Sequence, residues 1–150
     1  MKLNQYIDQL EQNCKLYATI NKNVSSKGVD WHIDHSLKVF NNVVFSLKES
    51  NPADFKWKFN FLRSYILCLG KIPRGKAKAP KAVNNLKSIS IEELHQQINE
   101  AKKYVLELPT FHKKSNFNHP YFGVLNLRMT ILFLEIHTHH HLKIIKDIVK

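Results

Sequence analysis

The 150-residue chain is predicted to be all-α, and three features of its sequence support this class. It contains only four glycines and five prolines, fewer than the turns of a β-rich fold require. Apolar residues recur at helical spacing through much of the chain. Hydrophobic residues make up 43% of the sequence, which is enough for one domain of this length to bury a core. We therefore expect a single domain, residues 1–150, folded as a helical bundle with an additional short helix.

Five helical stretches are expected, and residues that start or stop helices bound most of them. They are residues 3–21, 30–50, 54–69, 91–108, and a last helix that begins at Val124 or Leu125 and runs to the C-terminus. Asp30 is a candidate N-cap, and Ser90 with Glu93 is typical of a capping box. Gly70 and Pro109 should end the third and fourth helices. No strand is expected, and residues 110–123 are expected to be a connection.

The last helix carries a histidine pair, His137 and His141, at i, i+4 spacing. This spacing places both imidazoles on one face, one turn apart, where two histidines can bind one metal ion. At about 100° per residue, Phe133, Ile144 and Ile148 share that face, whereas His139 lies on the opposite face. We therefore expect the pair to point into the core and His139 to point toward water.

A third histidine is expected from the start of the second helix, residues 31–36 (WHIDHS). On the helical wheel His32 lies beside Val39 and Val43 on the apolar face, and His35 lies toward its edge. We therefore choose His32 as the first ligand, with His35 as the alternative. Three imidazoles from two helices, with one position left for water, are typical of an open catalytic metal site. The competing interpretation is that hydrogen bonds satisfy these histidines and no metal binds.

The net charge of +11 is concentrated in one part of the chain. Residues 55–91 hold nine Lys or Arg and no Asp or Glu, with a maximum in residues 71–81. Two prolines and a glycine predict a loop there. Arg74 and Lys76 are candidates for binding an anionic cosubstrate, and an ordinary solvated surface is the alternative.

The same basic region allows a different function. Four aromatic residues alternate with other residues through positions 55–61, and exposed rings among basic side chains can stack on nucleic-acid bases. No recognised nucleic-acid-binding motif is present. A basic nucleic-acid-binding helical protein is therefore an alternative, as is a non-catalytic, metal-free bundle.

Two segments resemble a known family. Residues 119–125 (HPYFGVL) followed by residues 137–142 (HTHHHL) resemble the C-terminal signature of DinB-related proteins. Residues 32–36 (HIDHS) are similar to the second-helix motif of that family. The resemblance implies a DinB/YfiT-like four-helix bundle, often a homodimer, in which His32, His137 and His141 bind a divalent metal. His119 and His140 also match family positions, and the basic loop is not part of the pattern.

Some relatives in this family are thiol S-transferases that use low-molecular-weight thiols, and one is a maleylpyruvate isomerase. We therefore expect a metal-dependent enzyme, a hydrolase or a thiol S-transferase acting on a small molecule. Nitrogen ligation suits Zn or Ni, with Fe, Co or Mn as alternatives. The chain lacks the glutamate of an HExxH motif, so His35 or His140 is expected to relay the proton.

The cysteines and the apolar runs indicate the compartment. Cys14 and Cys68 show no metal or redox spacing, so we expect buried free thiols in a reducing environment. The first sixteen residues do not have the pattern of a signal peptide, and the longest apolar run, residues 65–69, is too short to cross a bilayer. A cytoplasmic protein without a membrane partner is expected.

Overall fold

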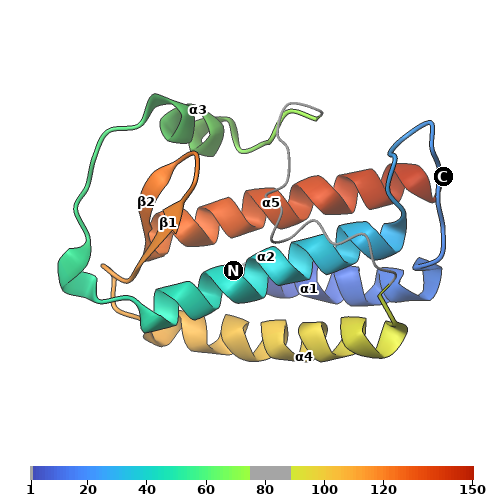
Figure 1. Cartoon of the computed structure of the whole chain (residues 1–150), viewed down its shortest axis with the longest axis horizontal. Coiled ribbons are helices and arrows are strands. Elements are labelled where there is room, and N and C mark those ends of the chain that lie inside the picture. Colours follow the sequence, from blue (N-terminus) through green and yellow to red (C-terminus); the bar gives the residue numbers. More distant parts are fainter. Residues whose placement is uncertain (1, 75–88) are drawn as a thin grey trace.

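A computed structural model describes residues 2–74 and 89–150, and this part of the chain is mostly helical (Figure 1). Its α-helices are α1 (Lys2–Asn13), α2 (Val29–Glu49), α3 (Phe61–Leu69), α4 (Ile91–Glu107) and α5 (Leu127–Ile148). The helical class is confirmed, although a small two-stranded sheet is also present. Among the described helices, none has the length and apolar character needed to cross a bilayer.

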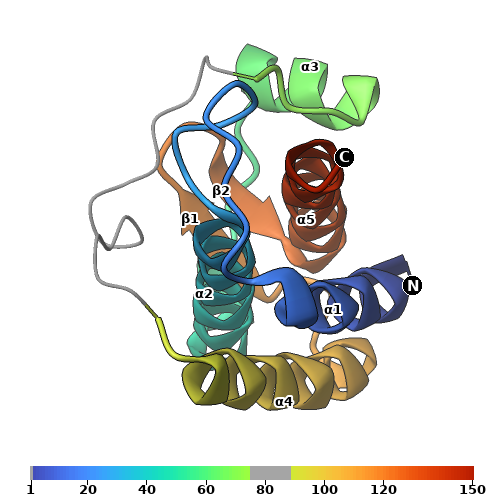
Figure 2. The same cartoon turned by 90° about the vertical axis from the view of Figure 1, so that its right-hand side faces the viewer.

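The four long helices α1, α2, α4 and α5 pack around one core (Figure 2). α2 lies between α4 and α5, and α1 contacts the same two helices from the other side. Side chains from all four helices fill the space between them, among them Leu3, Ile7, Ile33, Phe40, Leu94, Ile98, Leu134 and Ile145. The close packing of α2 against α5 brings the two histidine-bearing helices together.

α1 and α2 are bounded differently from the expectation. α1 ends at Asn13 and a short 3-10 turn, Cys14–Leu16, follows it, so residues 17–21 are not helical. α2 has Gly28 as its N-cap, and Asp30 lies inside the first turn. A side chain at position 28 would meet the Asp30 carboxylate, because a Cβ there would lie 2.6 Å from Oδ1. The close approach explains why glycine takes the cap position.

α3 is shorter than predicted, because it begins at Phe61 rather than near residue 54. Residues 52–54 form a 3-10 turn, and no regular element follows until the Asn60 side chain accepts a hydrogen bond from Arg63 N at 2.8 Å. The aromatic residues of positions 55–59 alternate, which is the period of an extended chain and not of a helix. Gly70 ends α3 as predicted, with the positive φ of 65° that glycine tolerates best.

The expected connection before the last helix contains a β-hairpin that the sequence analysis missed. β1 (Asn116–His119) pairs with β2 (Gly123–Asn126) in antiparallel register, with His119 opposite Gly123. β1 is mostly polar, and the two apolar residues of β2, Val124 and Leu125, are adjacent, so neither strand shows the apolar alternation that predicts a strand. α5 then begins at Leu127, capped by Asn126.

Arg63 attaches α3 to this hairpin. Its side chain is buried and donates hydrogen bonds to the carbonyl oxygens of Lys58, Phe122 and Val124. Against the described part of the chain, only Arg63 and Ile66 of α3 are buried. As a result Cys68 is exposed, so the prediction of two buried thiols is wrong for Cys68 and confirmed for Cys14.

The capping box at the start of α4 gives the first testable prediction. Ser90 Oγ accepts from Glu93 N at 3.1 Å, and a Glu93 carboxylate oxygen accepts from Ser90 N at 2.9 Å. Ser90→Ala should lower the free energy of unfolding by about 1 kcal/mol, measured by urea denaturation. The matched control is Ser46→Ala within α2, which should change stability by less than about 0.5 kcal/mol. Equal effects of the two substitutions would contradict the role of the cap.

Candidate metal centre

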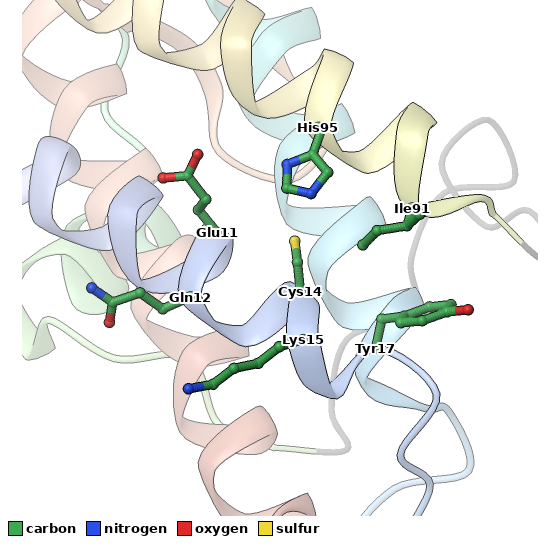
Figure 3. Close-up of a pocket in the computed structure, with 7 residues that line it drawn as sticks. All are labelled: Glu11, Gln12, Cys14, Lys15, Tyr17, Ile91 and His95. Carbon is green, nitrogen blue, oxygen red and sulfur yellow. The ribbon is translucent and has the colours of Figure 1, made fainter.

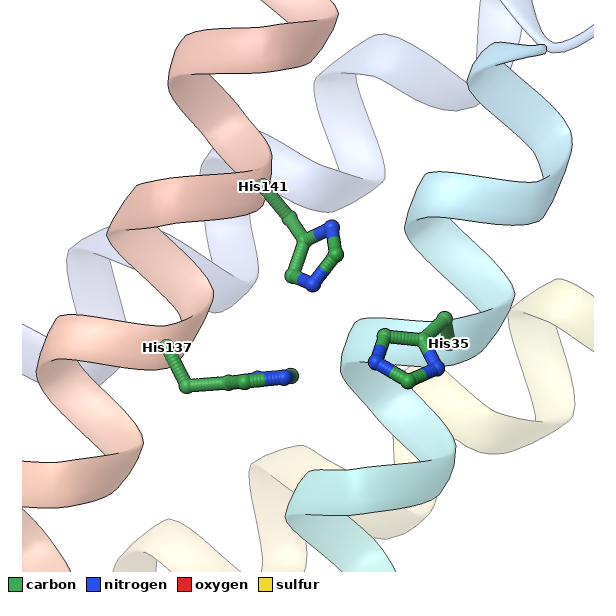
Figure 4. A group of neighbouring side chains, drawn as sticks. All are labelled: His35, His137 and His141. Carbon is green, nitrogen blue, oxygen red and sulfur yellow. The ribbon is translucent and has the colours of Figure 1, made fainter. Parts of the chain in front are cut away.

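His35 of α2 and His137 and His141 of α5 converge on one space between the two helices (Figure 4). Each offers one ring nitrogen, and the three nitrogens lie within 4.8 Å of one another. Within residues 2–74 and 89–150 this is the group of three or more His, Cys, Asp or Glu side chains placed so that it could hold a metal ion. The predicted inward direction of the i, i+4 pair is therefore confirmed.

The three imidazoles are enclosed by protein. His35 and His141 are 4% and 6% exposed, and the Nδ1 atom of His137 is hidden from solvent. Among the described residues this Nδ1 has no hydrogen-bond partner. A buried polar atom without a hydrogen-bond partner destabilises the fold. A bound ion could supply the interaction that this histidine lacks.

The donor set fits a divalent transition metal. It consists of three imidazole nitrogens and leaves one position of a tetrahedral ion open. Ligand atoms of such an ion, at about 2.0–2.1 Å from it, lie about 3.3 Å from one another. The present separations, up to 4.8 Å, are somewhat wider, so modest rotations of the rings would bring all three nitrogens to an ion.

Burial keeps the imidazoles of His137 and His141 neutral, which is the form that binds metal. Burial lowers the pKa of His137 and of His141 well below 6.5, and the neighbouring histidines lower both pKa values further. Near pH 7 each of these rings therefore has one nitrogen without a proton.

His32 lies behind His141 and outside the group of three nitrogens. Its Nδ1 is 2.9 Å from His141 Nδ1, and its Nε2 is 3.0 Å from Ser25 Oγ. If His141 Nε2 faces the ion, the proton of its Nδ1 is donated to His32, and the His32 Nε2 proton is donated to Ser25. The geometry thus favours the alternative ligand, His35. The choice of His32 as a ligand stays a prediction.

Trp31 packs on the histidine group, a contact that was not predicted from the sequence. Its ring stacks on His35, with centroids 4.8 Å apart and planes inclined by 6°, and it meets His32 edge-on. Trp31 and His35 are four residues apart on α2. This is the same i, i+4 spacing that joins His137 and His141, and it would have predicted that the two rings meet. Within the described residues the indole Nε1 is enclosed without a hydrogen-bond partner.

His140 and Arg74 lie beside the histidine group, and Arg74 is one of the basic residues in the sequence 71–81. The ring of His140 lies 5.2 Å from that of His141. Burial lowers the pKa of His140 and the positive charge of Arg74 lowers it further, whereas a hydrogen bond with the backbone of Ile72 acts in the opposite direction. Arg74 pairs with Asp147 at 2.8 Å. Lys76, the other predicted anion-binding residue, lies outside the described residues.

His119 stabilises the hairpin turn. Its Nδ1 accepts hydrogen bonds from the backbone N–H groups of Tyr121 and Phe122 at 3.1 and 3.2 Å. The ring stacks on Phe122 and contacts Phe133, and burial lowers its pKa to about 4. Phe133 contacts the rings of both His119 and His137, so it connects His119 to the histidine group.

His139, which was expected to point toward water, is partly exposed. Its ring stacks on Tyr6 of α1 with centroids 5.2 Å apart. The helical wheel identified the polar face of α5 correctly, but α1 packs beside that face and covers this position.

A hollow of about 530 Å³ lies between the end of α1 and the start of α4, away from the histidine group (Figure 3). Its lining includes Cys14, Glu11 and His95. Burial and, to a lesser degree, the negative charge of Glu11 raise the pKa of the Cys14 thiol to about 11. Cys14 is therefore protonated at neutral pH and is a poor nucleophile.

Comparisons with protein-family models, with curated proteins and with solved structures find no match. The histidine geometry between α2 and α5 is accordingly the main ground for a functional assignment. The resemblance to DinB-related proteins stays a prediction.

The buried histidines should make the metal-free protein sensitive to acid. In the unfolded chain the pKa of a histidine is about 6.5. In the folded protein burial lowers the pKa of His32 and that of His119, each to about 4. The unfolded chain therefore binds more protons, so stability is complete above about pH 6.5 and is lost as the pH falls toward 4. Urea denaturation in the presence of a chelator, at a series of pH values, measures this loss.

His119→Asn serves as a variant for the same measurement. Asparagine can still accept a hydrogen bond in the turn but does not titrate. The slope of unfolding free energy against pH should decrease by up to one proton equivalent. An unfolding free energy that stays constant from pH 7 to pH 5 in the original protein would contradict the burial of neutral histidines.

Proposed function

We propose that the protein binds one divalent metal ion through His35, His137 and His141. Two observations support this proposal. One ring nitrogen from each of the three histidines lies within 4.8 Å of the others, and the buried Nδ1 of His137 has no hydrogen-bond partner among the described residues. Zn or Ni is the expected ion, with Fe, Co or Mn as alternatives, because all of them accept imidazole ligands.

The neighbouring residues suit a catalytic role better than a purely structural one. Structural zinc sites have four protein ligands, whereas this group has three. When bound, the ion would supply an acidified water or hold a thiolate. His32 would orient His141 and fix its tautomer, and Trp31 would keep solvent from one side of His35. His140, beside the group, is the candidate for moving a proton.

We therefore assign the protein as a metal-dependent enzyme acting on a small molecule, either a hydrolase or a thiol S-transferase. The resemblance to DinB-related proteins supports this class, the bundle of that family and a homodimer. It also makes a low-molecular-weight thiol a candidate cosubstrate.

The substrate is expected to be anionic. Three neutral ligands leave the charge of a divalent ion uncompensated, and a buried charge requires compensation. The positive charge of Arg74 acts on both His32 and His140, so it is close enough to attract an anion to the same place. The carboxylate of Asp34 is directed elsewhere, since it binds Lys38 and Gln97.

Metal content tests the proposal directly. The purified, untagged protein, reconstituted with Zn or Ni and dialysed, should retain about one ion per chain by elemental analysis. His137→Ala, His141→Ala and His35→Ala should each abolish stoichiometric binding. His32→Ala should weaken the affinity about 10–100-fold, the range for a residue that orients a ligand, measured against a competing chelator.

His139→Ala is the matched control, because it removes a histidine of the same helix that stacks on Tyr6 instead. It should keep the full metal content. Failure of the original protein to take up either ion would overturn the proposal. If His32→Ala loses the ion and His35→Ala keeps it, His32 is the ligand and the start of α2 must rotate.

The anionic substrate class can be tested with simple probes. Acetate and thioglycolate, titrated into the Co-loaded protein, should change its visible absorption. Arg74→Ala should reduce their affinity severalfold without changing the cobalt content. Its effect on the unfolding free energy should stay below about 0.5 kcal/mol, since the pair with Asp147 is at the surface.

Lys146→Ala, which removes an exposed positive charge from α5, is the control for the Arg74 substitution. It should leave the affinity for both probes unchanged. Equal losses in the two variants would show only a general effect of net charge.

A further inference from the structure

α3 has an apolar face that the described part of the chain leaves uncovered. The face consists of Phe61, Leu62, Tyr65, Cys68 and Leu69, all of which are exposed. Phe61 is 75% exposed, and its ring stacks on Tyr65 with centroids 6.4 Å apart. Large exposed apolar patches on a folded protein mark interaction sites.

The α3 face continues onto neighbouring segments. Trp57 and Phe59, in the segment that leads into α3, are 58% and 67% exposed. Tyr121, in the hairpin turn, is exposed beside them, and Asn60 donates a hydrogen bond to its carbonyl at 3.1 Å. α3 itself lies on the outside of the molecule, next to the hairpin and α5 (Figure 1). The exposed apolar surface therefore extends from the α3 face over the preceding segment to the hairpin turn.

Positive charges border the α3 face, and negative charges are absent from the same part of the sequence. Lys56 and Lys58 precede it and Lys71 follows it, and all three are exposed. Residues 55–91 contain no Asp or Glu. The one charge within α3, Arg63, is turned inward onto backbone carbonyls. An apolar surface with a basic border complements a surface that is apolar inside and anionic at its edge.

We propose that the α3 face docks on the surface of an anionic lipid membrane. α3 would lie in the plane of the interface, with Phe61, Leu62 and Leu69 among the acyl chains and the flanking lysines at the phosphates. Trp and Tyr prefer this interfacial depth, which suits Trp57, Tyr65 and Tyr121. No transmembrane span is needed, because the contact is peripheral.

The charge distribution disfavours a second copy of the chain on the same face. A symmetric pair would bring the lysine borders of two α3 faces together without an acidic residue from either segment. The residue types disfavour a nucleic acid. Leu62 and Leu69 are aliphatic and offer no ring for base stacking, and the engaged Arg63 is not available for a phosphate.

Vesicle binding provides the test, and it does not depend on the metal centre. The full chain is sedimented with phosphatidylcholine vesicles, or with vesicles of equal parts phosphatidylcholine and phosphatidylglycerol. Binding should occur to the anionic vesicles, weaken as salt is added, and be the same for His137→Ala. Loss of metal in that variant without loss of vesicle binding separates this proposal from the proposed function.

Cys68 supplies a probe on the α3 face itself. It is exposed, whereas Cys14 is buried with a raised pKa, so a thiol-reactive environment-sensitive dye should label Cys68 selectively. Anionic vesicles should shift the emission of the dye to the blue. An unchanged spectrum with bound protein would place the contact elsewhere and overturn the proposal.

Substitutions separate the apolar and charged contributions. Phe61→Ser should weaken vesicle binding by about tenfold or more. Lys56→Gln with Lys58→Gln should weaken binding to anionic vesicles by about fivefold for each charge. Leu106→Ser is the control, because Leu106 is 76% exposed on α4, in another part of the molecule. All these positions are exposed, so the helical content should be unchanged by circular dichroism.

Three further results would overturn the proposal. The first is an absence of binding to anionic vesicles, and the second is equal binding to neutral and anionic vesicles. The third is a different occupant, seen as a dimer that Phe61→Ser dissociates or as single-stranded DNA binding that the same substitution removes. Light scattering detects the dimer, and a salt-dependent titration detects the binding of DNA.

Discussion

The packing of α2 against α5 is the constraint on which the rest of the structure depends. It encloses imidazoles from both helices, and an enclosed imidazole needs a partner for each nitrogen. His32 satisfies this need through His141 and Ser25, and the Nδ1 of His119 accepts hydrogen bonds from the hairpin turn. His137 Nδ1 is the exception within the described residues. An unsatisfied imidazole nitrogen beside two other imidazoles is better explained by a ligand than by packing alone.

The remaining elements support this arrangement from two sides. On one side α1 and α4 complete the core, and Tyr6 of α1 stacks on His139. On the other side the hairpin holds α3 through Arg63, which leaves the α3 face exposed. The histidine group and the α3 face thus belong to different parts of the fold, although both adjoin α5. Their chemistry is different, and each can be altered without the other.

Local signals in the sequence predicted the elements that depend on local interactions. The capping box of Ser90 and Glu93, the end of α3 at Gly70 and the inward direction of His137 and His141 all follow from neighbouring residues. The hairpin was missed because its strands lack apolar alternation. The start of α3 was misplaced because an alternating aromatic segment was interpreted as helical. The segment before α3 finds its partner in the hairpin, 61 residues away between Asn60 and Tyr121, whereas the two strands of the hairpin are close in sequence.

The sequence by itself determined the helical class, the faces of α5 and the set of histidines from which a metal site can be built. Only the tertiary structure decided which histidine of α2 joins His137 and His141. The helical wheel assumes one buried face, but nearly every residue from Gly28 to Leu37 is enclosed, because several segments surround the start of α2. Both His32 and His35 are therefore buried, and the rotation of α2 against α5 places His35 in the group and His32 behind His141. That rotation is set by contacts between helices about a hundred residues apart, and no local pattern encodes it.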